Sequence, residues 1–197
     1  MPTPQALFYF DLASPECYLA AERVNAVLPV VPEWRPVLGA KLSGPDADAL
    51  RRGAGREVYL AGVEETAAAR GLLEVRWPAP WRTGDDPTGD PEMAMRVATY
   101  ARQIGRAVAF SLAAFRQAFA GGRDLSDPDA VLLAAAACEM HPTAVLRGAE
   151  LRSVRAALGA TTEEAAELGV RSVPAVVAGG QVFSGDEELE VAAEASL

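Results

Sequence analysis

The segment Ser14-Pro15-Glu16-Cys17 carries the residue types best suited to chemistry in this chain, and it directly follows an aromatic run at residues 6–10. A serine followed by a proline and an acidic residue is typical of a helix start. The N-terminus of a helix offers free backbone N–H groups and the positive end of the helix dipole, and both favour an anion. Ser14 therefore either donates a hydrogen bond to a thiolate at this helix end or serves only as an ordinary helix cap.

Cys17 lies in the first turn of the same predicted helix, where the helix dipole favours a thiolate. The alternative is that Cys17 packs as a small hydrophobic residue. A Ser-x-x-Cys pair cannot close the disulfide that a Cys-x-x-Cys pair closes, so dithiol chemistry within the motif is excluded. Cys138 ends an alanine run and is expected in the core.

Two segments near the end of the chain carry further candidates for binding. If Val173-Pro174 is cis, the backbone N–H and C=O of Val173 become available for pairing with a peptide-like ligand; a trans proline at a strand start is the alternative. The run at residues 184–187 includes Asp186 and Glu187 and precedes a predicted helix. These acids either bind an ammonium group or only stabilise the helix start.

The loop that carries Trp77, Trp81 and Arg82 predicts an apolar pocket for an acidic substrate, or else simple aromatic packing. Its prolines and glycines, at 77–81 and 83–89, argue against regular structure. His141, the single histidine, is expected in a solvated connector. We expect no catalytic triad and no metal site, because the cysteines and the histidine lack zinc-ligand spacing.

These candidates require elements that position them, and the order of the predicted elements is β-α-β, then a block of helices, then β-β-α. The sequence therefore predicts an α/β fold in which two half-sheets, residues 1–43 and 160–197, form one domain and residues 44–159 form an inserted helical domain. The predicted strands are 6–10, 30–37 (an edge strand), 173–177 and 181–183. The predicted helices are 15–28, 56–69, 90–101, 107–120, one from 127, one ending near 159, and 187–197. After the helix that ends near 159, Thr161 and Glu164 have the spacing of a capping box.

Composition excludes several functional classes. The 197 residues include 18 basic and 27 acidic side chains, a net charge of −9, which argues against binding to nucleic acid or to an anionic membrane. No apolar run approaches the ~18 residues of a spanning helix. The first residues, 1–5, lack the basic region of a secretory signal, and two cysteines fit a reducing compartment. We therefore expect a cytoplasmic protein.

The motifs together resemble the DsbA-like thioredoxin superfamily, and within it the 2-hydroxychromene-2-carboxylate isomerases and kappa-class glutathione transferases. The resemblance rests on residues 8–20 around Ser14, on 34–39, on the helical segment 100–125 and on 169–174. It implies a thioredoxin-like domain interrupted by a helical domain, a homodimer, and glutathione or another low-molecular-weight thiol bound in the cleft between the domains.

The same resemblance implies roles for single residues. Ser14 would stabilise the thiolate, Val173 beside Pro174 would pair with the tripeptide backbone, and Asp186 and Glu187 would meet the amine of the thiol. A small aromatic or conjugated acid would add the thiolate reversibly, rotate and eliminate it. The residues predicted to line its pocket are Pro15, Trp77, Trp81 and Arg82.

The sequence also departs from the family pattern. Glu187 and Glu188 stand where the family commonly has Asp and Arg, which weakens the attraction for a glutathione carboxylate. Cys17 occupies the position of the second active-site cysteine of DsbA proteins. Two alternatives therefore stay open: a DsbA-like oxidoreductase that uses Cys17 alone, and a thioredoxin-fold binding protein without catalysis.

Overall fold

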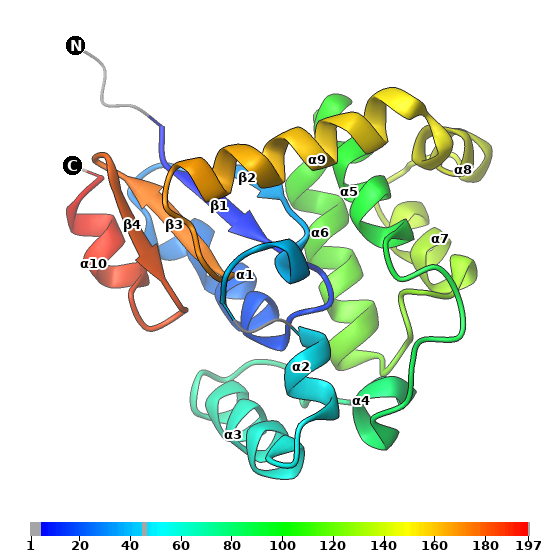
Figure 1. The fold of residues 1–197 in the computed structure, drawn as a ribbon, viewed down its shortest axis with the longest axis horizontal. Coiled ribbons are helices and arrows are strands. Elements are labelled where there is room, and N and C mark those ends of the chain that lie inside the picture. Colours follow the sequence, from blue (N-terminus) through cyan, green and yellow to red (C-terminus); the bar gives the residue numbers. More distant parts are fainter. Residues whose placement is uncertain (1–4, 45–46, 197) are drawn as a thin grey trace.

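A four-stranded mixed sheet lies at one end of the computed structural model, which describes residues 5–44 and 47–196 (Figure 1). The strand order is β2-β1-β3-β4. Residues 1–4, which carry most of the N-terminal segment considered above, lie outside the described residues, as do 45–46 and 197. Strand β1 (Leu7–Phe10) runs parallel to β2 (Glu33–Pro36), whereas β3 (Ala175–Ala178) is antiparallel to both β1 and β4 (Gln181–Ser184). This arrangement confirms the predicted α/β fold and places β2 at an edge.

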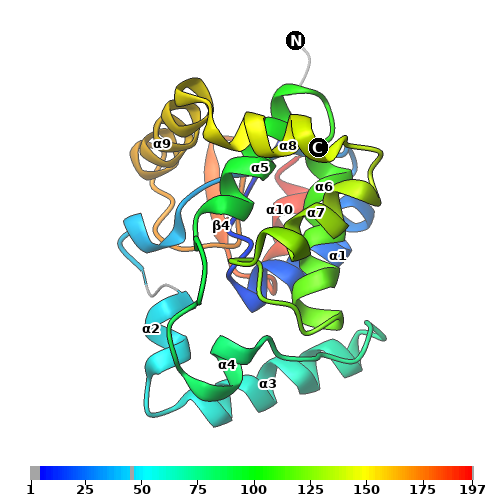
Figure 2. The ribbon, with the colours of Figure 1, turned by 90° about the vertical axis from the view of Figure 1, so that its right-hand side faces the viewer.

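Helices cover both faces of the sheet and form a second layer beside it (Figures 1 and 2). Helix α1 (Pro15–Val27) connects β1 to β2 and contacts α10 (Leu189–Glu194), while α9 (Arg152–Glu167) lies along the opposite face. The remaining helices are η1 (Gly39–Lys41), α2 (Ala47–Arg52), α3 (Arg56–Ala69), α4 (Ala79–Thr83), α5 (Met93–Gln103), α6 (Ala107–Phe115), the π-helical turn η2 (Arg116–Ala120), α7 (Pro128–Ala136) and α8 (Pro142–Glu150).

The alternation of side chains along β1 explains why the sheet has two buried faces. Phe8 and Phe10 point to the α1 side, where their rings lie 4.9 Å and 5.4 Å from the ring of Trp34. Tyr9 points to the other face and packs in a smaller cluster with Ala165 of α9. All three β1 aromatics are fully buried, so the strand that precedes Ser14 is held rigidly from both sides.

The segment from His141 to Glu167 differs from the prediction. The prediction of a single helix that ends near Gly159 is wrong, because α8 ends at Glu150 and α9 continues without a break through Gly159. The buried positions Val154, Leu158 and Ala165 recur at helical spacing on both sides of this glycine, so packing carries the helix across it. The predicted domain boundary at 159/160 therefore falls inside a helix.

Two polar residues of this segment also act differently from the prediction. Thr161 does not start a capping box; its hydroxyl donates to the carbonyl of Ala157 within α9 (2.9 Å). His141 is not a plain connector, because its Nδ1 accepts a hydrogen bond from the backbone N–H of Thr143 (3.3 Å) and caps α8. Both residues satisfy helix backbone groups locally.

Three further boundaries are corrected. The loop at 77–89 contains the short helix α4, which begins after Pro78 with a proline at its second position. Strand β2 is shorter than predicted because Val30 and Val31 are exposed before it. The last helix begins at Leu189, so Glu187 belongs to a turn.

Across 5–44 and 47–196, no helix combines the length and the apolar character needed to cross a membrane.

Candidate active site

The loop between β1 and α1 is held by the side chain of Asp11. Its Oδ1 accepts a hydrogen bond from the backbone N–H of Ala13 (2.9 Å), and its Oδ2 accepts one from the N–H of Gly39 (2.8 Å). A side chain at Gly39 would press against this carboxylate, because a Cβ there would lie 3.2 Å from Oδ2. Asp11 therefore fixes the loop that presents Ser14.

Ser14 caps α1, as its position before Pro15 predicts. Its Oγ accepts a hydrogen bond from the backbone N–H of Cys17 (3.2 Å) and donates one to Glu16 Oε2 (3.0 Å). The residue is only 5% exposed. The cap and the candidate catalytic hydroxyl are thus the same atom, so the two interpretations of Ser14 are compatible.

A pocket of about 200 Å³ opens at this hydroxyl, and we call it the Ser14 pocket. It joins the start of α1 to the segment around Val173-Pro174 and to the turn before α10. The structure therefore brings together five of the predicted site residues. The lining residues are Asp11, Ser14, Glu16, Gly39, Ala47, Leu50, Ser172, Val173, Pro174, Gly185, Asp186 and Glu187.

The Val173-Pro174 peptide bond is cis. The carbonyl of Pro174 accepts a hydrogen bond from the N–H of Gly185 (2.9 Å), which ties the two C-terminal segments of the pocket together. In the part of the chain that the structure describes, neither the N–H nor the C=O of Val173 forms a hydrogen bond. Val173 therefore offers one free donor and one free acceptor to an extended ligand.

Asp186 and Glu187 differ in what they contact. Asp186 is buried and forms ion pairs with Arg23 of α1, at 3.2 Å, and with Arg70 at the end of α3. Its charge is therefore already compensated, and it anchors the turn to two helices. Glu187 is exposed and has no ion pair within the described ranges. Glu187 is thus the carboxylate of the two that remains free to meet a ligand ammonium group.

Cys17 is fully buried and does not reach the pocket. Its Sγ accepts a weak hydrogen bond from the backbone N–H of Asp11 (3.5 Å). Burial raises the pKa of the Cys17 thiol well above its ordinary value, and the hydrogen bond with Ser14 offsets only part of that rise. The thiol therefore stays protonated and inaccessible at neutral pH, which favours packing over redox chemistry.

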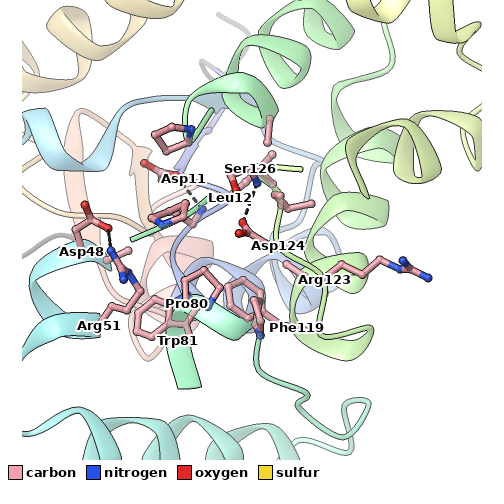
Figure 3. Close-up of a pocket in the computed structure, with 18 of the residues that line it drawn as sticks. Asp11, Leu12, Asp48, Arg51, Pro80, Trp81, Phe119, Arg123, Asp124 and Ser126 are labelled. Carbon is pink, nitrogen blue, oxygen red and sulfur yellow. Dashed lines mark hydrogen bonds and ion pairs between the residues drawn. The ribbon is translucent and has the colours of Figure 1, made fainter. Parts of the chain in front are cut away.

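A second pocket, of about 100 Å³, lies next to the first and is drawn in Figure 3; we call it the Trp81 pocket. The two pockets share Asp11 and Ala47. Its wall is mainly apolar and comes from four helices and the loops between them. The lining residues are Asp11, Leu12, Ala13, Ala47, Asp48, Arg51, Pro78, Pro80, Trp81, Pro87, Pro91, Ala94, Met95, Ala118, Phe119, Arg123, Asp124, Leu125 and Ser126.

The predicted pocket residues are only partly brought together. Trp81 lines the pocket, but Trp77 stands behind it, with its ring 5.6 Å from that of Trp81 and its Nε1 donating to Glu64 (2.6 Å). Arg82 is exposed and Pro15 is buried in the first turn of α1, and neither lines the two pockets.

The residues of the Trp81 pocket that sequence reasoning missed include Arg51 on α2, Met95 on α5 and Phe119 on η2. Each comes from a separate helix, and no local motif marks it. The sulfur of Met95 accepts a hydrogen bond from the N–H of Leu12 (3.2 Å), which joins this helix to the active-site loop. Phe119 projects from a π-helical turn, a feature often found at functional sites.

Solved structures with the same fold include an isomerase and thiol oxidoreductases. A 2-hydroxychromene-2-carboxylate isomerase superposes with a TM-score of 0.79 at 17% identity, covering 94% of this chain and 91% of the isomerase. A probable DsbA oxidoreductase from Streptomyces coelicolor gives a TM-score of 0.75 at 24% identity, covering 98% and 88%. The cytosolic disulfide reductase DsbM from Pseudomonas aeruginosa gives 0.67 at 16% identity, covering 98% and 95%. At these identities the likeness concerns the fold.

A search of curated proteins found no match. The family model of the DsbA-like thioredoxin domain, in contrast, matches residues 6–196. This range contains both half-sheets, the helices between them and both pockets. The chain therefore belongs to the DsbA-like thioredoxin domain family.

Proposed function

We propose that this protein is a thiol-dependent isomerase or transferase, in which Ser14 stabilises the thiolate of glutathione or another low-molecular-weight thiol. The observation that carries the proposal is the meeting of the Ser14 hydroxyl with the free backbone groups of Val173 in one pocket. The protein's own thiol at Cys17 is buried, so the reacting sulfur must come from a bound molecule. The isomerase and the glutathione-bound DsbM among the structures of the same fold support this choice.

The chemistry that the pocket can supply is activation of the thiol. A thiolate beside Ser14 would accept the hydroxyl hydrogen that Glu16 now accepts, and it would lie near the positive end of the α1 dipole. Both interactions favour the charged form of the thiol.

The reaction follows from that activation. The thiolate adds to the double bond of a small aromatic or conjugated acid, so that a C–S bond forms, the double bond becomes a single bond, and its π electron pair moves onto the conjugated carbonyl oxygen. Rotation about that bond and elimination of the thiolate then restore the double bond with changed geometry. No atom is gained or lost, so the thiol acts as a cofactor.

The charges of the Ser14 pocket bear on which thiol it takes. Its lining contains Asp11, Glu16, Asp186 and Glu187 and, among the described residues, no basic side chain. An ammonium group can pair with Glu187, whereas the carboxylates of glutathione find no cation there. A thiol with fewer carboxylates is therefore expected to bind at least as well.

Calorimetric titration with reduced glutathione, and in parallel with cysteamine, tests the proposal. We expect binding of at least one thiol, about tenfold weaker in Ser14→Ala and restored in Ser14→Thr, which keeps the hydroxyl. Ser172→Ala is the matched control, because it removes a hydroxyl that lines the same pocket but does not cap α1. Binding of neither thiol, or equal binding by Ser14→Ala, contradicts the proposed function.

A further inference from the structure

The Trp81 pocket contains a buried cation that is only half satisfied. The Arg51 side chain is 3% exposed, and its Nη2 donates to Asp48 (2.9 Å) and lies 3.4 Å from Asp86. Its Nη1 is buried and has no hydrogen-bond acceptor anywhere in the described part of the chain. A buried N–H of a guanidinium without an acceptor is costly, so this atom favours a ligand that brings an acceptor to it.

The carboxylates that line the same pocket do not accept a hydrogen bond from the Nη1 of Arg51. Asp124 accepts a hydrogen bond from the N–H of Ser126 (2.9 Å), and Asp11 is held by backbone N–H groups as described above. Asp48, at 58% exposed, is largely solvated, so water screens its charge. An anion at the free Nη1 is therefore attracted at close range by a buried cation. The carboxylates nearby repel it less, because they are either solvated or already hydrogen-bonded.

A second arginine lines the pocket but does not face it. Figure 3 shows the guanidinium of Arg123 extending away from Trp81 and Phe119, whereas Arg51 lies against the pocket beside Asp48. Arg123 is also exposed. Arg51 is thus the basic group positioned to bind a ligand there.

The remaining wall restricts the ligand's shape. Trp81 and Phe119 provide flat apolar surface, and Met95 fills the wall near Leu12. The volume of about 100 Å³ is smaller than the cavity of about 150 Å³ that accommodates benzene in another protein. The pocket therefore suits a short flat group of a few atoms more than a whole aromatic ring.

We propose that the Trp81 pocket binds the carboxylate end of a short conjugated acid, and that Arg51 selects it through its free Nη1. The proposal deepens the proposed function and rests on it for the reaction, because the two pockets adjoin at Asp11 and Ala47, and an acid held by Arg51 would extend toward the Ser14 pocket. Binding of the acid by itself requires no thiol.

Crotonate, a four-carbon conjugated acid, is a suitable probe, with the neutral crotonamide as its matched control. The indole N–H signals of the three tryptophans in a ¹⁵N NMR spectrum report the site, and Trp81→Phe assigns the signal of Trp81. We expect crotonate to shift that signal and to leave Trp34 unchanged, since the Trp34 Nε1 donates to Asn25 in the core (3.1 Å). Crotonamide is expected to bind at least about tenfold more weakly.

Arg51→Gln and Arg52→Gln separate the role of Arg51 from the general charge of α2. Arg52 is 52% exposed, pairs with the same Asp48 and Asp86, and does not line the pocket. We expect crotonate to bind at least about tenfold more weakly to Arg51→Gln and within twofold of the parent protein to Arg52→Gln. If Arg51→Gln does not fold, the comparison of crotonate with crotonamide on the parent protein decides.

The inference is overturned if crotonate leaves the Trp81 signal unshifted, if crotonamide binds equally well, or if a folded Arg51→Gln variant binds crotonate normally. Its failure is distinguishable from that of the proposed function, which the thiol titrations test separately. Selective crotonate binding without thiol binding keeps Arg51 as the carboxylate site and removes the thiol reaction. Thiol binding without crotonate binding does the reverse.

Discussion

The Ser14 pocket and the Trp81 pocket share a wall but are built in opposite ways. The first is formed by chain turns, and its chemistry comes from a helix cap, the free backbone of Val173 and carboxylates. The second is formed by helices, and its chemistry comes from apolar side chains and the buried guanidinium of Arg51. Under the proposed function, the Ser14 pocket would hold the thiol and the Trp81 pocket would bind the acid that reacts with it.

Trp81→Ala is expected to have the largest effect, and it tests whether the pockets work separately. Trp81 is 5% exposed, so its removal should lower the free energy of unfolding by about 3 kcal/mol, measured by urea denaturation. Crotonate binding should be lost, whereas thiol binding should stay within twofold. Trp77→Ala is the control and should cost less, because Trp77 is only half-buried and stands behind the wall. Equal loss of thiol binding in Trp81→Ala would contradict this separation of roles.

Asp186→Asn should act on the other pocket. The substitution leaves Arg23 and Arg70 without their shared buried partner, so we expect the free energy of unfolding to fall by about 2 kcal/mol. The thiol should bind more weakly because the turn that carries Glu187 loosens, and crotonate binding should not change. Glu190→Gln is the control, since this exposed partner of Arg23 should contribute less than about 0.5 kcal/mol.

The same contrast between the two pockets decides which of their residues the sequence could predict. Ser14 and Val173-Pro174 could be predicted because helix caps and proline turns depend on a few adjacent residues. Arg51 could not, because its environment is made by α2, α4 and α5, which are distant along the chain. Arg82 follows Trp81 directly in sequence, yet it does not line the pocket, because successive helical residues point in different directions.

The fold shows a similar limit. The edge position of β2 followed from its prolines, and the β-α-β start from the aromatic run and the cap. The course of α9 through Gly159 did not follow, because burial of Leu158 and Ala165 outweighs the local preference of glycine. The predicted division into domains at 159/160 remains a prediction, although the helix that crosses it is continuous.

A smaller effect on the free energy of unfolding is expected when the pH is lowered. It concerns the ion pair between Asp90 and Arg96, which lies on α5, one of the helices that line the Trp81 pocket. The hydrogen bonds from Arg96 hold the pKa of Asp90 below its ordinary value of 3.8. A carboxyl with a lowered pKa in the folded state stabilises the fold above its ordinary pKa, and this contribution disappears as the pH falls below that value. Asp90→Asn should therefore lower the free energy of unfolding at pH 7 and cause no such difference near pH 2. Because Asp90 is 49% exposed, the effect at pH 7 should stay below about 1 kcal/mol.

No reaction at all is expected from Cys17 in the folded protein. Because the thiol is buried and its pKa is raised, iodoacetamide at neutral pH should leave it unmodified, as mass spectrometry of the intact protein can show. The same treatment in guanidinium chloride should label both cysteines. Rapid labelling of Cys17 in the native state would return the single-cysteine oxidoreductase to consideration and would assign the reactive sulfur to the protein.

The strand order has a consequence for how the chain is made. Strand β1 gains β2 as a neighbour early, but its other neighbour, β3, begins only at Ala175. During synthesis, the second edge of β1 therefore stays without a partner until the chain has been made beyond Ala175, and an open edge of aromatic residues is prone to pair with other chains. A product truncated before β3 would keep Ser14 and its helix but display that edge, so the segment from Ala175 onward protects solubility as well as completing the Ser14 pocket.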